Sequence, residues 1–211
     1  MVRRTKEDAE ATRGKLLDAA QQVFYTKGVA GASLLDIAQA ANLTRGAIYW
    51  HFQNKSDLFH AMLQRVTFPF EQALHLSEEA CAREGNAAKG IVAAVRFVLH
   101  TVSTDATARQ VLDIALHKTE CVGEMFAIRE RRMQGALKFT CQMERMLQLA
   151  ALQQQVSLSI PVSSAAHALH AVFCGVLHAW LLHLEPPFDL EEEGVRAISL
   201  YLQALGLCAD K

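Results

Sequence analysis

Proline and glycine are scarce in this chain, with four prolines and eleven glycines in 211 residues. A β-sandwich or a β-barrel needs many tight turns, which these two residue types supply, so such folds are disfavoured. Collagen-like and disordered chains are excluded because 51% of the residues are hydrophobic and only 20% are charged. The composition therefore favours an all-α protein that is long enough to bury a substantial core.

Paired cysteines and an export signal are also missing. The five cysteines are odd in number and scattered, and none forms a C-x-x-C pair. The N-terminus is basic, but no apolar signal-peptide core follows it. These absences predict a reduced, cytoplasmic protein.

One long stretch lacks charge altogether. Between Arg145 and Glu185 there is no Asp, Glu, Lys or Arg, and residues 165–184 are mostly apolar. This segment is long enough to cross a bilayer, but four histidines interrupt it and no basic cluster flanks it. We therefore expect a doubly buried helix rather than a membrane span.

The net charge of −1 conceals a division of the chain. Residues 1–65 contain nine Lys and Arg against six Asp and Glu, whereas residues 66–211 contain twelve against sixteen. A basic N-terminal part on a mildly acidic body predicts that a polyanion is bound at one end only.

Capping residues divide the basic part into short helices. An apolar stripe over residues 16–24 predicts the first helix, and Gly28 ends it. Ser33 and Asp36 form a capping box for a second helix, and Thr44 caps a third. The body predicts six further helices, at approximately 54–82, 87–103, 105–116, 122–153, 162–184 and 189–207. Pro69 falls inside the fourth helix, where it should kink or end it.

Residues 34–52 predict a helix-turn-helix. Ala38 and Ala41 are small enough for two helices to cross closely, and Asn42 tolerates the left-handed conformation of a tight turn. The expected inner face consists of Ile37, Leu43, Ile48 and Phe52. The second helix then turns groups that bind phosphates or read bases toward its rim and outer face: Thr44, Arg45, Ala47, Tyr49, Trp50 and His51. Two amphipathic core helices with aromatic filler remain the alternative.

The motifs of this region resemble the N-terminal domain of TetR-type repressors. They are Gly28-Val29, then Ser33-Leu34-x-Asp36-Ile37-Ala38, then Thr44-Arg45-Gly46-Ala47-Ile48-Tyr49-Trp50-His51-Phe52-x-Asn54-Lys55. The resemblance covers residues 10–62 densely and is nearest to the AcrR/TtgR-type regulators of multidrug efflux pumps. It implies a DNA-binding domain over residues 1–55, a ligand-binding and dimerisation domain over residues 56–211, and no catalytic activity. No phosphate loop or nucleophile elbow argues for an enzyme.

The resemblance also implies roles in DNA binding. Thr44, Tyr49, His51 and Lys55 would contact phosphates, and Arg45, Gly46, Ala47 and Trp50 would contact bases. A basic arm of Arg3, Arg4 and Lys6 would follow the backbone or enter a minor groove. Such a small domain makes few base contacts, so two copies on a pseudo-palindromic operator are expected.

A homodimer requires an apolar surface in the body, and the last two helices offer one. Its expected residues are Leu169, Val172, Val176, Trp180 and His183 on residues 162–184, and Ile198, Tyr201, Leu202 and Leu205 near the C-terminus. Two such helices from each subunit would form a four-helix interface.

A pocket for a hydrophobic small-molecule inducer is the remaining expectation. Phe139, Met143, His170, Phe173, Cys174, Leu177 and His178 would line it, Val66, Phe97, Val98, Leu112, Leu116 and His117 would close it, and Glu120 would fix a polar group. Metal sensing, thiol oxidation and a specific metabolite stay open as alternatives. A metal is disfavoured because His170 and His178 are ~12 Å apart along a helix and cannot share one ion.

Overall fold

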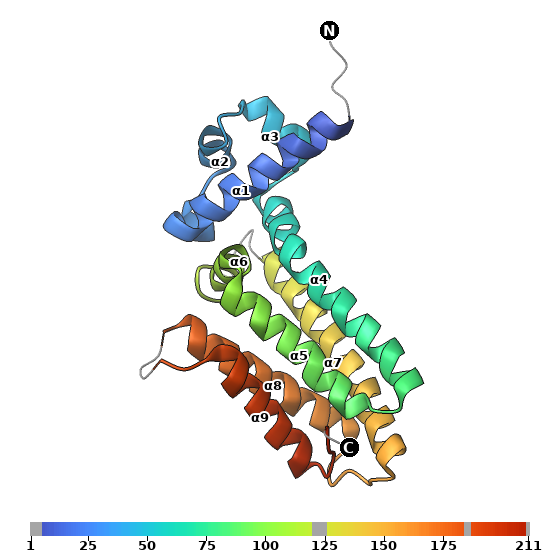
Figure 1. The fold of residues 1–211 in the computed structure, drawn as a ribbon. Coiled ribbons are helices and arrows are strands. Elements are labelled where there is room, and N and C mark those ends of the chain that lie inside the picture. The colour runs from blue at the N-terminus through green and yellow to red at the C-terminus, as the bar shows by residue number, and fades with distance from the viewer. Residues whose placement is uncertain (1–5, 120–125, 184–186, 210–211) are drawn as a thin grey trace. The chain divides into compact units, whose positions relative to one another are not determined.

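The computed structural model describes residues 6–119, 126–183 and 187–209, and every regular element within them is an α-helix (Figure 1). The helices are α1 (Lys6–Gly31), α2 (Leu34–Ala40), α3 (Arg45–His51), α4 (Lys55–Glu84), α5 (Ala87–Thr104), α6 (Ala106–His117), α7 (Phe126–Gln154), α8 (Val162–Leu181) and α9 (Leu190–Ala204). The all-α prediction, with a short-helix region followed by a long-helix body, is confirmed for the described residues.

The chain divides into two compact units. The first contains residues 1–66 and 110–132, and the second contains residues 67–109 and 133–211. Helices α4, α6 and α7 each contribute residues to both units. The domain boundary expected at residue 55 stays a prediction.

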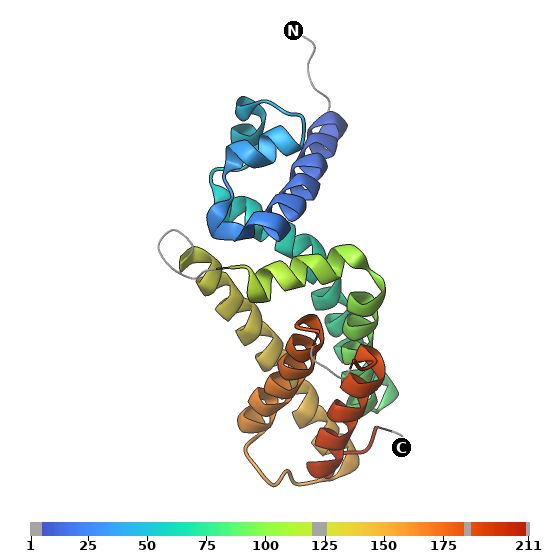
Figure 2. The ribbon, with the colours of Figure 1, turned by 90° about the vertical axis from the view of Figure 1, so that its left-hand side faces the viewer.

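The core of the first unit forms around the apolar stripe of α1. Leu16, Ala20 and Phe24 are fully buried, and the ring of Phe24 lies 6.0 Å from the ring of Phe59 on α4. Helix α2 packs against α1, and α3 packs against α2 (Figure 2). The two short helices depend on such packing, because helices of seven residues are not stable alone.

Gly28 bends α1 near its C-terminal end. Its φ of 71° is left-handed, which glycine adopts without steric cost. The amide of Val29 then donates to the carbonyl of Lys118, 3.0 Å away, instead of continuing a straight helix. The ammonium of Lys118 also lies 4.7 Å from the ring centre of Tyr25, which joins the residues after α6 to α1.

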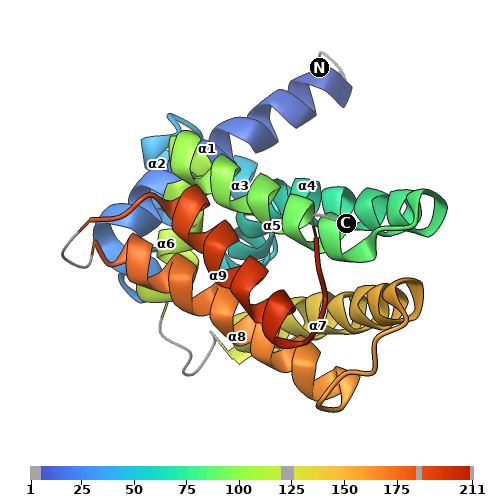
Figure 3. The same ribbon diagram turned by 60° about the horizontal axis from the view of Figure 1, so that its bottom comes forward.

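The second unit is a bundle in which α5 packs against α9 and α9 against α8 (Figure 3). Close approach of α9 depends on Gly194, which is buried. A methyl group at Gly194 would overlap the side chain of Leu99 on α5 and lie 3.5 Å from Val176 on α8. The absent side chain therefore sets the spacing of these three helices.

Ion pairs join helices of the second unit at its surface. Glu78 on α4 accepts two hydrogen bonds from the guanidinium of Arg145 on α7, at 2.7 and 3.1 Å, and a third from Gln142. The hydrogen bond from Arg145 lowers the pKa of Glu78, so the pair stays charged at neutral pH. Glu191 on α9 pairs with Arg96 and His100 of α5.

Two expectations about long helices can now be evaluated. Helix α4 runs without interruption through Pro69, so the proline does not end it. Among the described residues, α8 alone is long and apolar enough to cross a membrane by length and composition. A helix in the core or subunit interface of a globular protein meets the same criteria, so α8 is not a membrane sign by itself. The expectation of a doubly buried helix is wrong for the single chain, because only 22% of the apolar window of α8 is buried.

Candidate nucleic-acid interface

A capping box fixes the start of α2. The hydroxyl of Ser33 accepts from the amide of Asp36 at 3.1 Å, and the carboxylate of Asp36 accepts from the amide of Ser33 at 2.9 Å. Lys27 adds an ion pair to the same carboxylate at 2.7 Å. The hydrogen bond from Lys27, together with those from Ser33, holds the pKa of Asp36 well below its usual range. The predicted capping box is confirmed.

A tight turn places α3 across α2. Asn42 has a φ of 54°, the left-handed conformation predicted for it, and the amide of Leu43 donates to the carbonyl of Ala38 at 2.9 Å. The hydroxyl of Thr44 then caps α3 by accepting from the amide of Ala47 at 3.2 Å. The helix-turn-helix geometry follows from these three residues.

Helix α3 has a buried face and an exposed face. Ile48 is fully buried and Phe52 is 2% exposed, as predicted for the inner face. Trp50 is 71% exposed and Tyr49 is 50% exposed, while the guanidinium of Arg45 lies 5.5 Å from the centre of the Tyr49 ring. Three large side chains that stabilise no core thus project from one short helix, which is the arrangement expected of a helix that reads DNA.

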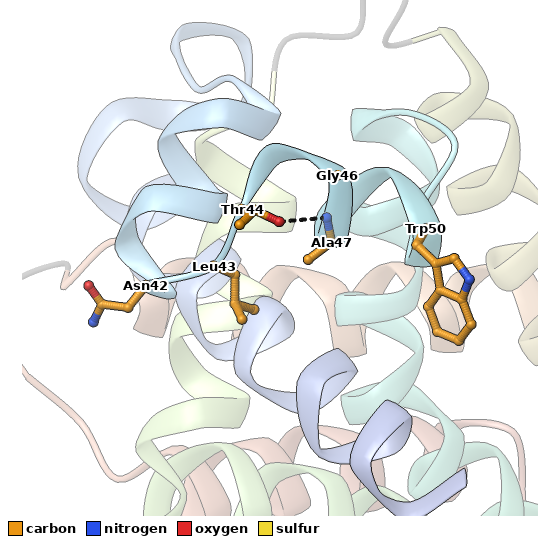
Figure 4. Close-up of a pocket in the computed structure, with 6 residues that line it drawn as sticks. All are labelled: Asn42, Leu43, Thr44, Gly46, Ala47 and Trp50. Atoms are coloured by element: carbon orange, nitrogen blue, oxygen red, sulfur yellow. Dashed lines mark hydrogen bonds between the residues drawn. The ribbon is translucent and has the colours of Figure 1, made fainter. Parts of the chain in front are cut away.

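The exposed face carries a hollow, and Figure 4 draws the residues that line it. Its lining consists of Asn42, Leu43, Thr44, Gly46, Ala47 and Trp50. Leu43, which was expected on the inner face, is partly buried and also lines this hollow.

Lys55 is partly engaged within its own chain. It begins α4, as predicted, but its ammonium donates to the carbonyls of Ala30 and Ala32 at 3.0 and 2.8 Å. Two of its three N–H donors are thus engaged in joining α4 to the end of α1, and only one is left for a phosphate. Lys6 is exposed at the start of α1, whereas Arg3 and Arg4 lie outside the described residues.

Four of the expected inducer-pocket residues lie together between α7 and α8. The ring of Phe139 stacks on Phe173 with centres 5.6 Å apart and lies 5.2 Å from the ring of His170. The sulfur of Cys174 lies 3.2 Å from Nε2 of His170. Burial lowers the pKa of His170, and the neighbouring His167 lowers it further, so its imidazole is neutral at neutral pH.

The other expected pocket residues are distributed over both units. In the second unit Met143 is fully buried, Leu177 is 6% exposed, and Phe97 meets the ring of Phe70 edge-on; Val98 is half-buried and His178 is exposed. In the first unit Val66 is buried, Leu112 and Leu116 are half-buried, and His117 hydrogen-bonds Asp113 at 2.7 Å. Glu120 lies outside the described residues. Within the described part of the chain no three His, Cys, Asp or Glu side chains come together as metal ligands.

Four of the nine expected dimer residues lie in the chain's own core, and the other five are half-buried or exposed. Leu169, Ile198, Leu202 and Leu205 are buried within a single chain. Val176 faces Gly194, the hydroxyl of Tyr201 donates to the carbonyl of Ala165, and Trp180 lies beneath the guanidinium of Arg109. Val172 is half-buried and His183 is exposed in a left-handed turn after α8.

Other residues on these two helices face outward and escaped the sequence prediction. On α8 they include the small residues Ala171 and Gly175, and on α9 they include Leu200, which is 59% exposed. Their signal was present, because two small residues four apart on an apolar helix indicate a close helix contact. The lack of charged residues in α8 concealed which face its own chain covers.

Comparisons with known proteins agree with this geometry. Residues 16–62 match the family model described as bacterial regulatory proteins of the tetR family, and residues 89–207 match the C-terminal region of MAATS-type transcriptional repressors. The chain is 35% identical over 183 residues to the HTH-type transcriptional regulator TtgR of Pseudomonas putida, and the match covers 86% of each protein.

Two solved structures share the fold over nearly the whole chain. One is NalD, the secondary repressor of the MexAB-OprM multidrug efflux pump in Pseudomonas aeruginosa, with a TM-score of 0.84, 30% identity, and coverage of 94% of this chain and 98% of NalD. The other is SmeT in complex with triclosan, with a TM-score of 0.83, 32% identity, and coverage of 92% and 91%. SmeT is the repressor of the Stenotrophomonas maltophilia efflux pump SmeDEF.

Proposed function

Because the chain belongs to the TetR family of bacterial transcriptional regulators, we propose that it is a dimeric repressor that a hydrophobic small molecule releases from its operator. We propose further that it acts in the cytoplasm and controls a multidrug efflux operon. The relatives support this proposal, since NalD and SmeT both repress such pumps and each covers more than nine-tenths of the chain.

One observation carries the DNA-binding part of the proposal. Helix α3 is held by a cap, a left-handed turn and a buried Ile48, yet it leaves Arg45, Tyr49 and Trp50 exposed. A rigid helix with an exposed basic and aromatic face is suited to enter a major groove. Arg45 can donate two hydrogen bonds to a guanine, and the hydroxyls of Thr44 and Tyr49 can contact phosphates. Lys6 is exposed and can also reach a phosphate, whereas Nε2 of His51 is buried.

The dimer proposal rests on the poor burial of α8. This helix has a mean hydropathy of 1.3, but only 22% of its apolar window is buried inside the chain. An apolar helix left so uncovered favours a partner, and a second copy provides one through Ala171, Gly175 and the neighbouring Leu200 of α9. Two recognition helices on one dimer would bind half-sites about 34–36 Å apart.

The aromatic group between α7 and α8 supports the inducer proposal. Phe139 and Phe173 provide stacked rings, and a neutral His170 beside them can accept or donate one hydrogen bond without the cost of a buried charge. A phenolic or aromatic compound suits these groups. Triclosan is the first compound to test, since it occupies the related SmeT.

Release follows from linkage between the two binding events. An inducer that binds the released conformation of the dimer more tightly than the DNA-binding conformation weakens DNA binding. The loss of DNA affinity cannot exceed this difference in inducer affinity. Helix α4 is a continuous connection, because it belongs to the first unit up to Val66 and to the second from Thr67. Pro69 has no N–H to donate to the carbonyl of Arg65, so α4 is easiest to bend there. Replacing Pro69 by alanine should therefore weaken induction in a reporter assay, and unchanged induction would contradict the pivot.

The proposal is tested by fluorescence anisotropy of the purified protein with labelled DNA from upstream of its own gene. We expect tight, sequence-dependent binding that decreases steeply with salt, by about 0.9 in the logarithmic slope for each phosphate contact. Triclosan or another apolar antimicrobial should reverse it. Binding that only a metal, a chelator or an oxidant reverses would contradict drug release, and equal affinity for unrelated DNA would contradict specific repression at this site.

A further inference from the structure

The hollow on the outer face of α3 has apolar walls. Leu43, Ala47 and the indole of Trp50 border it, and Asn42 and Thr44 lie at its polar edge (Figure 4). Leucine and tryptophan gain nothing from exposure to water, yet Trp50 is 71% exposed and Leu43 is only partly buried. The walls therefore favour an apolar group arriving from outside the chain.

One backbone donor of the hollow is already engaged. The amide of Ala47 already donates to both the hydroxyl and the carbonyl of Thr44, at 3.2 and 3.0 Å. At Gly46, an added Cβ would meet only the hydroxyl of Thr44, 3.9 Å away, so the fold itself has room for alanine there. Packing within the protein therefore does not require glycine at position 46. Its missing side chain instead leaves room for a group that approaches from outside the chain.

We propose that this hollow receives the C5-methyl group of a thymine in the operator. Among the major-groove edges of the four bases, only that of thymine carries an apolar group. The hollow is continuous with the exposed face of α3 that enters the groove, so the methyl reaches it without a separate docking surface. This inference rests on the proposed repressor function and assigns one base of each half-site, beside the guanine available to Arg45.

The test replaces thymine by deoxyuridine, which removes the methyl and leaves every hydrogen-bonding group unchanged. The operator is first located by footprinting, and each symmetric pair of thymines is then substituted in turn. At one pair, removing the methyl from a single half-site should increase the Kd from anisotropy about fourfold, the value for one buried methyl. Removing it from both half-sites should increase the Kd about fifteenfold. Substitution at the remaining pairs should change the Kd by less than twofold.

Two variants assign the effect to the hollow. With Ala47→Gly, which removes one wall, the penalty for uracil at the sensitive pair should fall below twofold. With Arg45→Ala, whose side chain does not line the hollow, binding should weaken while the uracil penalty stays the same. Circular dichroism checks that both variants fold.

Three results would overturn the inference. A fully uracil-substituted operator that binds as well as the thymine form would show that no methyl is read. A uracil penalty that persists unchanged in Ala47→Gly would place the methyl contact elsewhere. If the protein bound no thymine-containing upstream DNA more tightly than unrelated DNA, the repressor function would be refuted, and the thymine assignment with it.

Discussion

In the first unit, short helices are fixed by side chains that are neighbours in sequence, whereas in the second unit long helices are held by residues far apart in the chain. Ser33 caps α2 through Asp36, three residues away, while Glu78 reaches Arg145 across 67 positions. The first arrangement exposes chemistry on a rigid scaffold, and the second encloses apolar groups between helices that can shift. In the proposed repressor, the first construction would suit recognition of a constant DNA shape, and the second would suit a response to variable small molecules.

The largest effect is expected when the proposed dimer surface of the second unit is disrupted. Gly175→Glu places a charge on the outward face of α8, where nothing lies within 4 Å inside the chain. We expect a folded monomer in analytical ultracentrifugation and a loss of operator affinity of about 100-fold or more, because the half-sites no longer act together. Gly135→Glu, equally open but on α7, is the matched control. A Gly175→Glu protein that stays dimeric would contradict the proposed surface.

Loss of a base contact should separate binding from stability in the first unit. Arg45→Ala removes an exposed side chain of α3, so the melting temperature should change by less than one degree. Operator affinity should fall by about 1–3 kcal/mol per half-site, as for loss of a bidentate contact to guanine. Anisotropy at constant salt measures this, with scrambled DNA as the control. An equal loss on operator and scrambled DNA would assign Arg45 to phosphate instead.

The second unit should show the reverse behaviour. Gly194→Ala forces a methyl against Leu99 between α5 and α9, and overpacking of this kind costs about 1–3 kcal/mol of unfolding free energy. Denaturant unfolding measures the loss. Gly135→Ala, where nothing lies within 4 Å, should instead gain up to about 1 kcal/mol from helix propensity. If the two variants were equally stable, the close packing at Gly194 would not matter.

The cap of α2 offers a smaller test of local construction. Ser33→Ala removes the acceptor for the amide of Asp36 and should cost about 1 kcal/mol of stability. Ser164→Ala, in the first turn of α8 and not at a cap, should cost less than half of that. Thermal unfolding monitored by circular dichroism compares the two. Equal effects would mean that tertiary packing alone holds α2.

The smallest expected effect concerns pH. The pKa of His170 is lowered in the folded protein, so the unfolded chain binds its proton more readily. Stability is therefore greatest above about pH 6.5 and decreases as the pH falls below the unfolded pKa. Melting temperatures between pH 7.5 and 5.5 should decline less in His170→Gln than in the native protein. The exposed His75→Gln variant serves as control, and an identical decline in His170→Gln would contradict the shift.

Much of the fold could be predicted because its signals are local. The capping box at Ser33, the turn at Asn42 and the cap at Thr44 each need only a few adjacent residues, and all three are confirmed. The hydrogen bonds of Lys55 to Ala30 and Ala32 were not predictable in this way. They depend on which backbone carbonyls the fold brings within reach of the ammonium group.

The body of the chain was harder to predict for a related reason. A helix without any charged residue, such as α8, does not readily reveal which face its own chain covers. Leu169 and Leu202 were therefore placed at a subunit interface although both are fully buried in one chain. Phe139, His170 and Phe173 were expected to line one pocket. Their direct ring contacts could not be predicted, because they depend on how α7 packs against α8.

The positions of the two tryptophans divide the molecule for spectroscopy. Trp50 is largely in water on the recognition helix, whereas Trp180 is half-buried beneath Arg109 in the second unit. Since the chain has only these two, its intrinsic emission is the sum of a red-shifted signal from Trp50 and a bluer one from Trp180. A Trp50→Phe protein would report on Trp180 alone, and a Trp180→Phe protein on Trp50 alone. Operator binding and the proposed inducer binding can thus be followed separately, without a label, in these two single-tryptophan variants.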